Sequence, residues 1–191
     1  MRAVGSLVLV ALVALTLSGC AAFVIAGAGT AAVAAHDRRT LGAMIDDQTI
    51  ELKSASAMKS EDELHQNTHV NVTSMNGIVL LSGEATTPEL RDRVLAKMRE
   101  VPAIRRIVNE IRIAPPSTAA DRSNDTWLTT KVKTKLIHTE DIDSTRVKVV
   151  TENGVVYLLG LVTQKEAEIA TEAARSVGGV ERVVKVFEFI D

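Results

Sequence analysis

The sequence has few of the side chains on which enzymes and cross-linked domains depend. A single cysteine, Cys20, excludes a disulfide within the 191-residue chain and leaves no pair of thiols for chemistry. The four histidines, at positions 36, 65, 69 and 138, lack the spacing of metal ligands. The formal net charge is −2, so no global basic field favours binding to nucleic acid. We therefore predict no catalytic residues, no metal and no enzyme activity, and any attraction to anionic partners must be local.

One pair of histidines has a spacing that would place both side chains on the same face of a helix. His65 and His69 are four residues apart, and residues at that spacing are neighbours on a helix surface. The stretch from Glu61 to Asn67, however, reads as a polar loop that enters a strand. We therefore predict no metal site at this pair.

The first 19 residues have the three parts of a secretory signal peptide. Arg2 gives a basic start, an apolar run extends from Leu7 to Leu17, and small residues precede the cleavage point. The sequence Leu17-Ser18-Gly19-Cys20 resembles the bacterial lipobox, where a peptidase cleaves before a lipid-bearing cysteine. The resemblance implies an S-diacylglycerol group and an N-acyl chain such as palmitate on Cys20, with no other cofactor. Lipidation also explains a lone thiol better than a structural role does, since an exposed thiol is a liability in an oxidising compartment.

The residues after the cysteine leave an alternative open. Apolar and small residues continue to Ala35, so the whole run is long enough to span a membrane as an uncleaved helix. Its second half is mostly Ala and Gly, which suits a flexible tether better than a lipid-facing helix. Ala21 bears on location, because an Asp at this position in similar Gram-negative lipoproteins favours retention in the inner membrane. We therefore expect the outer membrane, on its periplasmic face.

The chain resembles itself at a spacing of about 77 residues, which sets the number of domains. Residues 70–83 read VNVTSMNGIVLLSG, and residues 147–160 read VKVVTENGVVYLLG. Each copy predicts a strand, an Asn-Gly turn and a second strand, because both central positions of a two-residue hairpin turn need positive φ. The Asn-Gly pairs are turns rather than phosphate loops, since neither opens a helix after a glycine-rich fingerprint. A glycine ends each copy at the same place, Gly83 and Gly160.

Helices are predicted on both sides of each hairpin. Before the hairpins they are expected over 47–58 and 125–137, with an Asp placed to cap each one. After the hairpins, the segments 86–89 and 163–166 predict capping boxes with a threonine as N-cap. Runs rich in β-formers, 104–113 and 180–190, then close each copy. The apolar stripes of the second helices are at Leu90, Val94, Met98 and Val101 and at Ala167, Ala170, Ala174 and Val177.

The resulting order α-β-β-α-β predicts an α+β fold made of two tandem small domains. Two antiparallel strands, a crossover helix and a third strand give each domain a three-stranded mixed sheet with two helices. Domains of this size are marginal in stability, so the other sheet face or the partner repeat can supply extra burial. Residues 78–81 and 155–159 are apolar on both faces, which allows the repeats to pack on one another. The predicted segments are a signal peptide at 1–19, a lipidated cysteine and flexible tether at 20–45, domains at 46–113 and 123–191, and a linker at 114–122.

The paired units resemble BON domains, modules of bacterial envelope proteins. The resemblance extends to the segments that open them: Asp37-Arg38-Arg39-Thr40 leading to Asp46-Asp47-Gln48-Thr49, and Ser123-Asn124-Asp125-Thr126-Trp127. With the lipobox, these segments are similar to those of dual-BON outer-membrane lipoproteins linked to cell division and membrane integrity. The resemblance implies phospholipid binding without catalysis.

The first helix of the second unit carries the predicted binding site. Leu128, Val132 and Leu136, together with Lys135, define one side, whose apolar members should face the sheet. The opposite side combines the only Trp, an Ile and lysines, as a helix at a membrane interface does. We predict that this side binds anionic phospholipid membranes, such as those with phosphatidylglycerol or cardiolipin. Its residues are Trp127, Thr130, Lys131, Thr134 and Ile137, with Lys133 at the flank.

Two other interpretations of the same side stay open. An aromatic residue at a helix start often packs on a neighbouring domain, and the lysines then form a solvated face. Alternatively, the Trp and Ile side docks an envelope protein partner from an assembly or division machine, which would make the protein an adaptor. The equivalent helix of the first unit, around Leu52 and Lys53, lacks the Trp and most of the positive charge. We therefore predict lipid contact by the second unit only.

Overall fold

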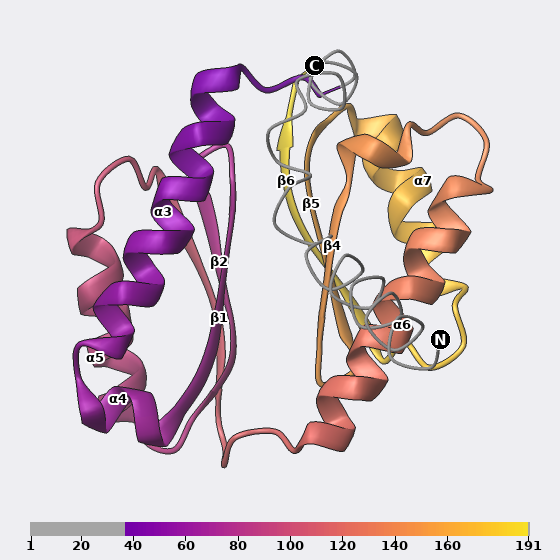
Figure 1. Cartoon of the computed structure of the whole chain (residues 1–191). Coiled ribbons are helices and arrows are strands. Elements are labelled where there is room, and N and C mark those ends of the chain that lie inside the picture. The colour runs from indigo at the N-terminus through magenta and orange to yellow at the C-terminus, as the bar shows by residue number, and fades with distance from the viewer. Residues whose placement is uncertain (1–36, 191) are drawn as a thin grey trace, which may run out of the picture. The chain divides into compact units, whose positions relative to one another are not determined.

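The computed structural model describes residues 37–190, which form two α+β modules (Figure 1). The signal peptide, Cys20 and most of the predicted tether lie outside the described residues. No helix within 37–190 has the length and apolar character needed to cross a membrane. The first module contains α3 (Leu41–Lys59), α4 (Asp62–Asn67), β1 (Thr68–Met75), β2 (Ile78–Ala85), α5 (Pro88–Glu100) and β3 (Arg106–Ile113). The second contains α6 (Ala119–Ile137), the 3-10 turn η1 (Ser144–Arg146), β4 (Lys148–Glu152), β5 (Val155–Val162), α7 (Gln164–Arg175) and β6 (Arg182–Phe189).

Each module has a three-stranded mixed sheet, which confirms the predicted fold class. The strand orders are β1-β2-β3 and β4-β5-β6. The first two strands of each sheet pair antiparallel, and the third pairs parallel with the central strand. The parallel pairing requires a crossover connection, which α5 and α7 provide.

The two hairpin turns have the backbone geometry that the Asn-Gly pairs predict. Asn76 and Gly77 have φ values of 52° and 72°, and Asn153 and Gly154 have values of 50° and 72°. Positive φ at both positions is the geometry of a type I′ turn, whose twist matches that of the flanking strands. The recurring motif therefore sets the register of both hairpins.

The first helix of each module starts earlier than predicted, which corrects both the helix starts and the adjoining segments. Thr40 is the N-cap of α3 and accepts from the Ala43 N–H at 3.1 Å. Thr118 is the N-cap of α6 and forms a capping box with Asp121. The end of the predicted tether, from residue 41, and the end of the predicted linker, from residue 119, are therefore helical. The aspartates expected to cap these helices lie inside them instead.

Two further predictions about helices were wrong. The stretch 61–67 is not a loop but contains α4, because Leu64 is fully buried and Asp62 and Glu63 suit the positive end of the helix dipole. The first module thus has three helices rather than two. In α5 the N-cap is Thr87, so Glu89 does not occupy the capping-box position, whereas the box in α7 is present.

Buried side chains form three clusters, and the third lies between the modules. Alternate residues of a strand point to opposite faces of its sheet. In β2, Val79 and Leu81 pack under the helices of the first module, while Ile78 and Leu80 contact the second module. The two repeats therefore pack on one another, as the apolar residues on both faces of these strands allow. The cluster between the modules consists of Met75, Ile78, Leu80, Val155, Tyr157, Leu159 and Val186.

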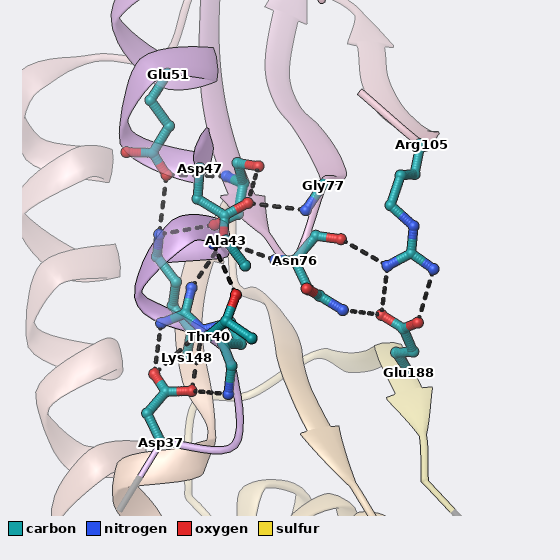
Figure 2. Close-up of polar contacts among 12 residues, drawn as sticks. Asp37, Thr40, Ala43, Asp47, Glu51, Asn76, Gly77, Arg105, Lys148 and Glu188 are labelled. Atoms are coloured by element: carbon teal, nitrogen blue, oxygen red, sulfur yellow. Dashed lines mark hydrogen bonds and ion pairs between the residues drawn. The ribbon is translucent and has the colours of Figure 1, made fainter. Parts of the chain in front are cut away.

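Asp47 connects the first helix to the hairpin turn in the first module (Figure 2). Its carboxylate accepts the backbone N–H groups of Asn76 at 2.7 Å and Gly77 at 2.8 Å. It also accepts from the Ser74 hydroxyl at 2.6 Å and from Arg39 at 2.8 Å. Burial alone would raise the pKa of the Asp47 carboxyl, but these hydrogen bonds outweigh it and lower the pKa.

Polar contacts at the same turn reach the second module. Glu188 accepts from the Asn76 side chain at 2.7 Å and from Arg105 at 2.9 Å (Figure 2). Lys148 donates to Glu51 at 2.9 Å. These contacts flank the apolar cluster between the modules, so the two repeats share both an apolar and a polar interface.

Candidate functional site

The exposed side of α6 is positioned by a buried side and by an anchored turn. Leu128, Val132 and Leu136 recur every four residues and are buried against the sheet. Asp125 accepts the N–H groups of Asn153 at 2.7 Å and Gly154 at 2.9 Å, as Asp47 does in the first module. The helix is therefore fixed in rotation, and its opposite side is presented to solvent.

The structure places the predicted residues on that opposite side. Trp127 is 63% exposed and Ile137 is 66% exposed, which are large values for such apolar side chains. Thr130, Thr134 and Lys133 are also exposed, and Lys131 is half-buried. Trp127, Thr130, Lys131 and Thr134 line one groove, whereas Lys133 and Ile137 do not belong to its lining.

This groove lies between α6 and the turn that follows α7, and its volume is about 570 Å³. The far wall consists of Ser176, Val177 and Gly178. Lys131 donates from Nζ to the carbonyl oxygen of Gly178, which links the two walls. The Lys131 side chain thereby reaches from α6 to the turn after α7.

Two residues that were not predicted to belong to the site also line the groove, one in α6 and one directly after it. Lys135, which was grouped with the side facing the sheet, is exposed and faces the groove instead. His138 follows the helix, and its Nδ1 lies 2.8 Å from the carbonyl oxygen of Thr134. The far wall was missed because residues 176–178 lie about 50 positions beyond Trp127, where a helical wheel gives no information.

The electrostatics of the groove favour an anion. Two lysines, Lys131 and Lys135, line it, and no carboxylate does. The remaining lining is His138, the Trp127 ring, the Val177 side chain and small or hydroxyl-bearing residues. The groove thus combines apolar walls with cationic groups, an arrangement that suits an amphiphilic anion.

A second polar cluster lies between the modules around two buried carboxylates. Glu152 accepts from the Asn71 side chain at 2.7 Å, and Glu84 accepts from the Asn153 side chain and from the Ser117 N–H at 3.0 Å. Burial is the main cause that raises the pKa of the Glu152 carboxyl, and the nearby Glu84 carboxylate adds to it. Their hydrogen bonds to the partner repeat make these carboxylates part of the interface.

Within residues 37–190 no three His, Cys, Asp or Glu side chains are grouped so as to hold a metal ion. His65 lies in α4 and His69 in β1, so this pair shares no helix face. The groove beside α6 is therefore the feature with the clearest binding chemistry.

Comparison with known proteins gives the family. The model of the BON domain matches residues 46–115 and again residues 124–191. The chain belongs to the BON-domain family. The order of elements in each module, α-β-β-α-β with α4 added in the first, is thus the BON domain of this chain.

Three relatives match this BON-domain protein over most of its length. Outer membrane lipoprotein DolP of Haemophilus influenzae is 40% identical over 175 residues, covering 92% of this chain and 91% of the relative. A 21 kDa hemolysin of Actinobacillus pleuropneumoniae is 34% identical, covering 81% and 79%. Osmotically-inducible protein Y of Escherichia coli is 27% identical, covering 75% and 72%. None of these names denotes an enzyme.

Proposed function

We propose that this BON-domain protein is a lipid-anchored protein of the outer membrane that faces the periplasm and binds anionic phospholipid through α6. The name of its DolP relative and the lipobox at Cys20 support the location. The observation that carries the binding role is the exposure of Trp127 and Ile137 beside lysines on a helix whose other side is buried. Such binding, at division sites among others, would support envelope integrity.

The size of the interaction fits reversible binding. Each lysine near an anionic surface contributes about 1 kcal/mol. Burial of an aliphatic side chain such as Ile137 contributes roughly 1.5 to 3 kcal/mol. An acyl anchor on Cys20 would raise the local lipid concentration, so even a weak contact at Trp127 would be occupied. The acyl anchor alone keeps the protein on the membrane, so the additional contact through α6 can respond to the lipid composition of the surface.

The first module provides an internal comparison. Its α3 exposes Leu41 at 65%, Ile45 at 66% and Leu52 at 64%. Leu41 and Ile45 were not predicted on this helix because both fall in the predicted tether. This side has no Trp, and Asp46 is exposed on the same helix. We therefore keep the prediction that the second module makes the lipid contact.

Trp127, the only Trp in the chain, reports on the contact directly. The mature chain with Cys20→Ala should show a blue shift of its emission with phosphatidylglycerol or cardiolipin vesicles, and little change with phosphatidylcholine vesicles. The absence of a shift with both anionic lipids would refute the proposal.

Co-sedimentation with vesicles can compare two variants that carry the same change on different helices. Trp127→Glu should lose vesicle binding, because a carboxylate replaces the ring at the membrane interface. Leu52→Glu places the same change at an exposed apolar position of α3 and should leave binding intact. If Trp127→Glu keeps vesicle binding but loses a protein partner, the adaptor function replaces lipid binding.

A further inference from the structure

The groove beside α6 continues beyond the residues described above. A second hollow of about 400 Å³ lies between α6 and α7. The two hollows share Lys135 and Ser176, so they are consecutive sections of one groove. Ile169 and Ala173 of α7 give the second section its apolar wall. A helix that merely lies flat on a membrane needs no such wall on its neighbour.

The dimensions of the groove match one acyl chain. The stretch from Trp127 to His138 along α6 corresponds to about 17 Å at the rise of an α-helix. One leaflet of a bilayer contributes about half of a hydrocarbon core of roughly 30 Å. The first section alone, at about 570 Å³, lies within the size range of small-molecule sites. An extended acyl chain therefore fits the length of the groove and the volume of its two sections.

The charges of the groove indicate the other part of the ligand. The ammonium-bearing side chains of Lys131 and Lys135 line the first section, where no carboxylate is present. The one carboxylate, Glu172, lines the second section. An anionic head group is thus favoured next to the first section, with the chain extending along the apolar walls. Phosphate on a glycerol backbone has this combination of charge and attached chain.

We propose that the groove between α6 and α7 binds a single anionic phospholipid molecule, with its phosphate near Lys131 and Lys135 and one acyl chain along the groove. This inference rests on the proposed function and adds to it a site that holds one lipid molecule per protein. The protein then takes individual lipid molecules out of their leaflet plane, in addition to lying on the surface.

Gly178 offers a way to close the groove without disturbing α6. It lines the far wall, and a Cβ placed there would meet no atom within 4 Å. Gly178→Leu should therefore fold normally and occupy part of the first section. Ser176→Phe, at the junction of the two sections, is a second variant with the same purpose. Gly42→Leu is the matched control, since that Cβ would meet only Thr40 Oγ1, at 3.7 Å.

The probe is dihexanoylphosphatidylglycerol below its critical micelle concentration, added to the mature chain with Cys20→Ala. Trp127 lines the groove, so its emission should change saturably with one lipid per protein. Gly178→Leu and Ser176→Phe should weaken monomer binding by about ten-fold or more. Both variants should still co-sediment with phosphatidylglycerol vesicles, and Gly42→Leu should bind both lipid forms as the parent does. Circular dichroism verifies that each variant is folded.

The outcomes separate this inference from the proposed function. Vesicle binding without monomer binding overturns the groove site and leaves the surface contact standing. Monomer binding that folded Gly178→Leu and Ser176→Phe both retain also overturns it, because the lipid then lies elsewhere. Failure to bind either form overturns both proposals.

Discussion

A single carboxylate in each module holds the first helix against the hairpin turn. Asp47 and Asp125 each accept the two N–H groups of an Asn-Gly pair. The type I′ geometry leaves these N–H groups without strand partners, and a buried N–H needs an acceptor. The sequence suggested helix caps at both positions because Asp favours N-caps, yet the donors that they satisfy belong to the turns.

Removal of the carboxylate at Asp125 should therefore be costly. Asp125→Ala leaves two donors without an acceptor, and each hydrogen bond to a charged group contributes about 1.5 to 3 kcal/mol. We expect the free energy of unfolding to fall by about 3 kcal/mol, measured by urea denaturation with circular dichroism. Asp92→Ala removes an exposed carboxylate and should change the free energy of unfolding by less than about 0.5 kcal/mol. Equal stability of the two variants would contradict this account.

Strands and helices differ in how far the sequence determines them. The hairpins follow from the Asn-Gly turns alone, and the stripes of α5 and α7 follow from their spacing, because both signals are local. The early starts of α3 and α6 depend on Thr40 and Thr118, which resembled parts of a tether and a linker. The short helix α4 depends on burial of Leu64, which only tertiary packing provides.

The same distinction holds for the candidate site. One helix face was sufficient to predict Trp127 and its neighbours, since residues of one helix are related by a fixed rotation. The wall formed by Ser176, Val177 and Gly178 depends on how the two helices pack, and no local pattern reports that. Lys135 was misplaced because its direction is close to the boundary between the two sides.

The glycines that recur at the end of each hairpin motif allow close approach of two backbones. A Cβ at Gly83 would lie 2.0 Å from the carbonyl oxygen of His69, and φ at Gly83 is 111°. Gly83→Ala should therefore strain the pairing of β1 with β2 and lower the free energy of unfolding by about 3 kcal/mol or more. Thermal unfolding followed by circular dichroism measures the change.

Gly178→Ala is the control for this substitution, since nothing lies within 4 Å of its added methyl group. It should leave the free energy of unfolding unchanged within about 0.5 kcal/mol. A small effect of Gly83→Ala, similar to that of Gly178→Ala, would show that β1 can move away from β2 at this point.

At the scale of the molecule, the start of the described chain is fastened to the second module. Arg38 donates to both oxygens of Glu166, at 2.6 and 3.0 Å, and to the carbonyl oxygen of Leu161. Burial would raise the pKa of the Glu166 carboxyl, but hydrogen bonds from Arg38, the Thr163 N–H and Arg146 lower it to about 2. The segment before α3 thus connects the two repeats.

The stability that this connection contributes should depend on pH. Arg38→Ala should lower the free energy of unfolding by about 1 to 2 kcal/mol at neutral pH. The folded-state pKa of Glu166 is below its ordinary value of 4.5, so the stabilisation is present above pH 4.5 and is lost as pH falls towards 2. The difference between the parent and Arg38→Ala, measured by urea unfolding, should shrink over that range. A difference that persists at the acid end would assign the effect of Arg38 to packing.

At the interface between the repeats, the pKa of the Glu152 carboxyl is shifted upward, in the opposite direction to that of Glu166. Burial raises the pKa of its carboxyl, the Glu84 and Asp125 carboxylates add to the effect, and the Asn71 hydrogen bond and His69 oppose it. A group whose pKa is raised on folding stabilises the fold below its unfolded pKa, and that contribution is lost as pH rises through the folded pKa. Burial therefore makes the Glu152 carboxyl less favourable to stability at neutral pH than near pH 4, which is the cost of keeping it at the interface.

Glu152→Gln should remove that cost, because the amide oxygen still accepts from the Asn71 side chain and carries no charge. We expect a higher melting temperature than that of the parent at pH 7 and a smaller difference near pH 4, measured by calorimetry. Glu168→Gln, an exposed change on α7, should not show this dependence. Glu152 lies where the repeats meet. A higher melting temperature of Glu152→Gln at neutral pH would therefore mean that the native interface is less stable than it could be. A lower melting temperature at neutral pH would contradict this account. It would show that the Asn71 side chain requires a charged acceptor and that the hydrogen bond to the Glu152 carboxylate holds the modules together.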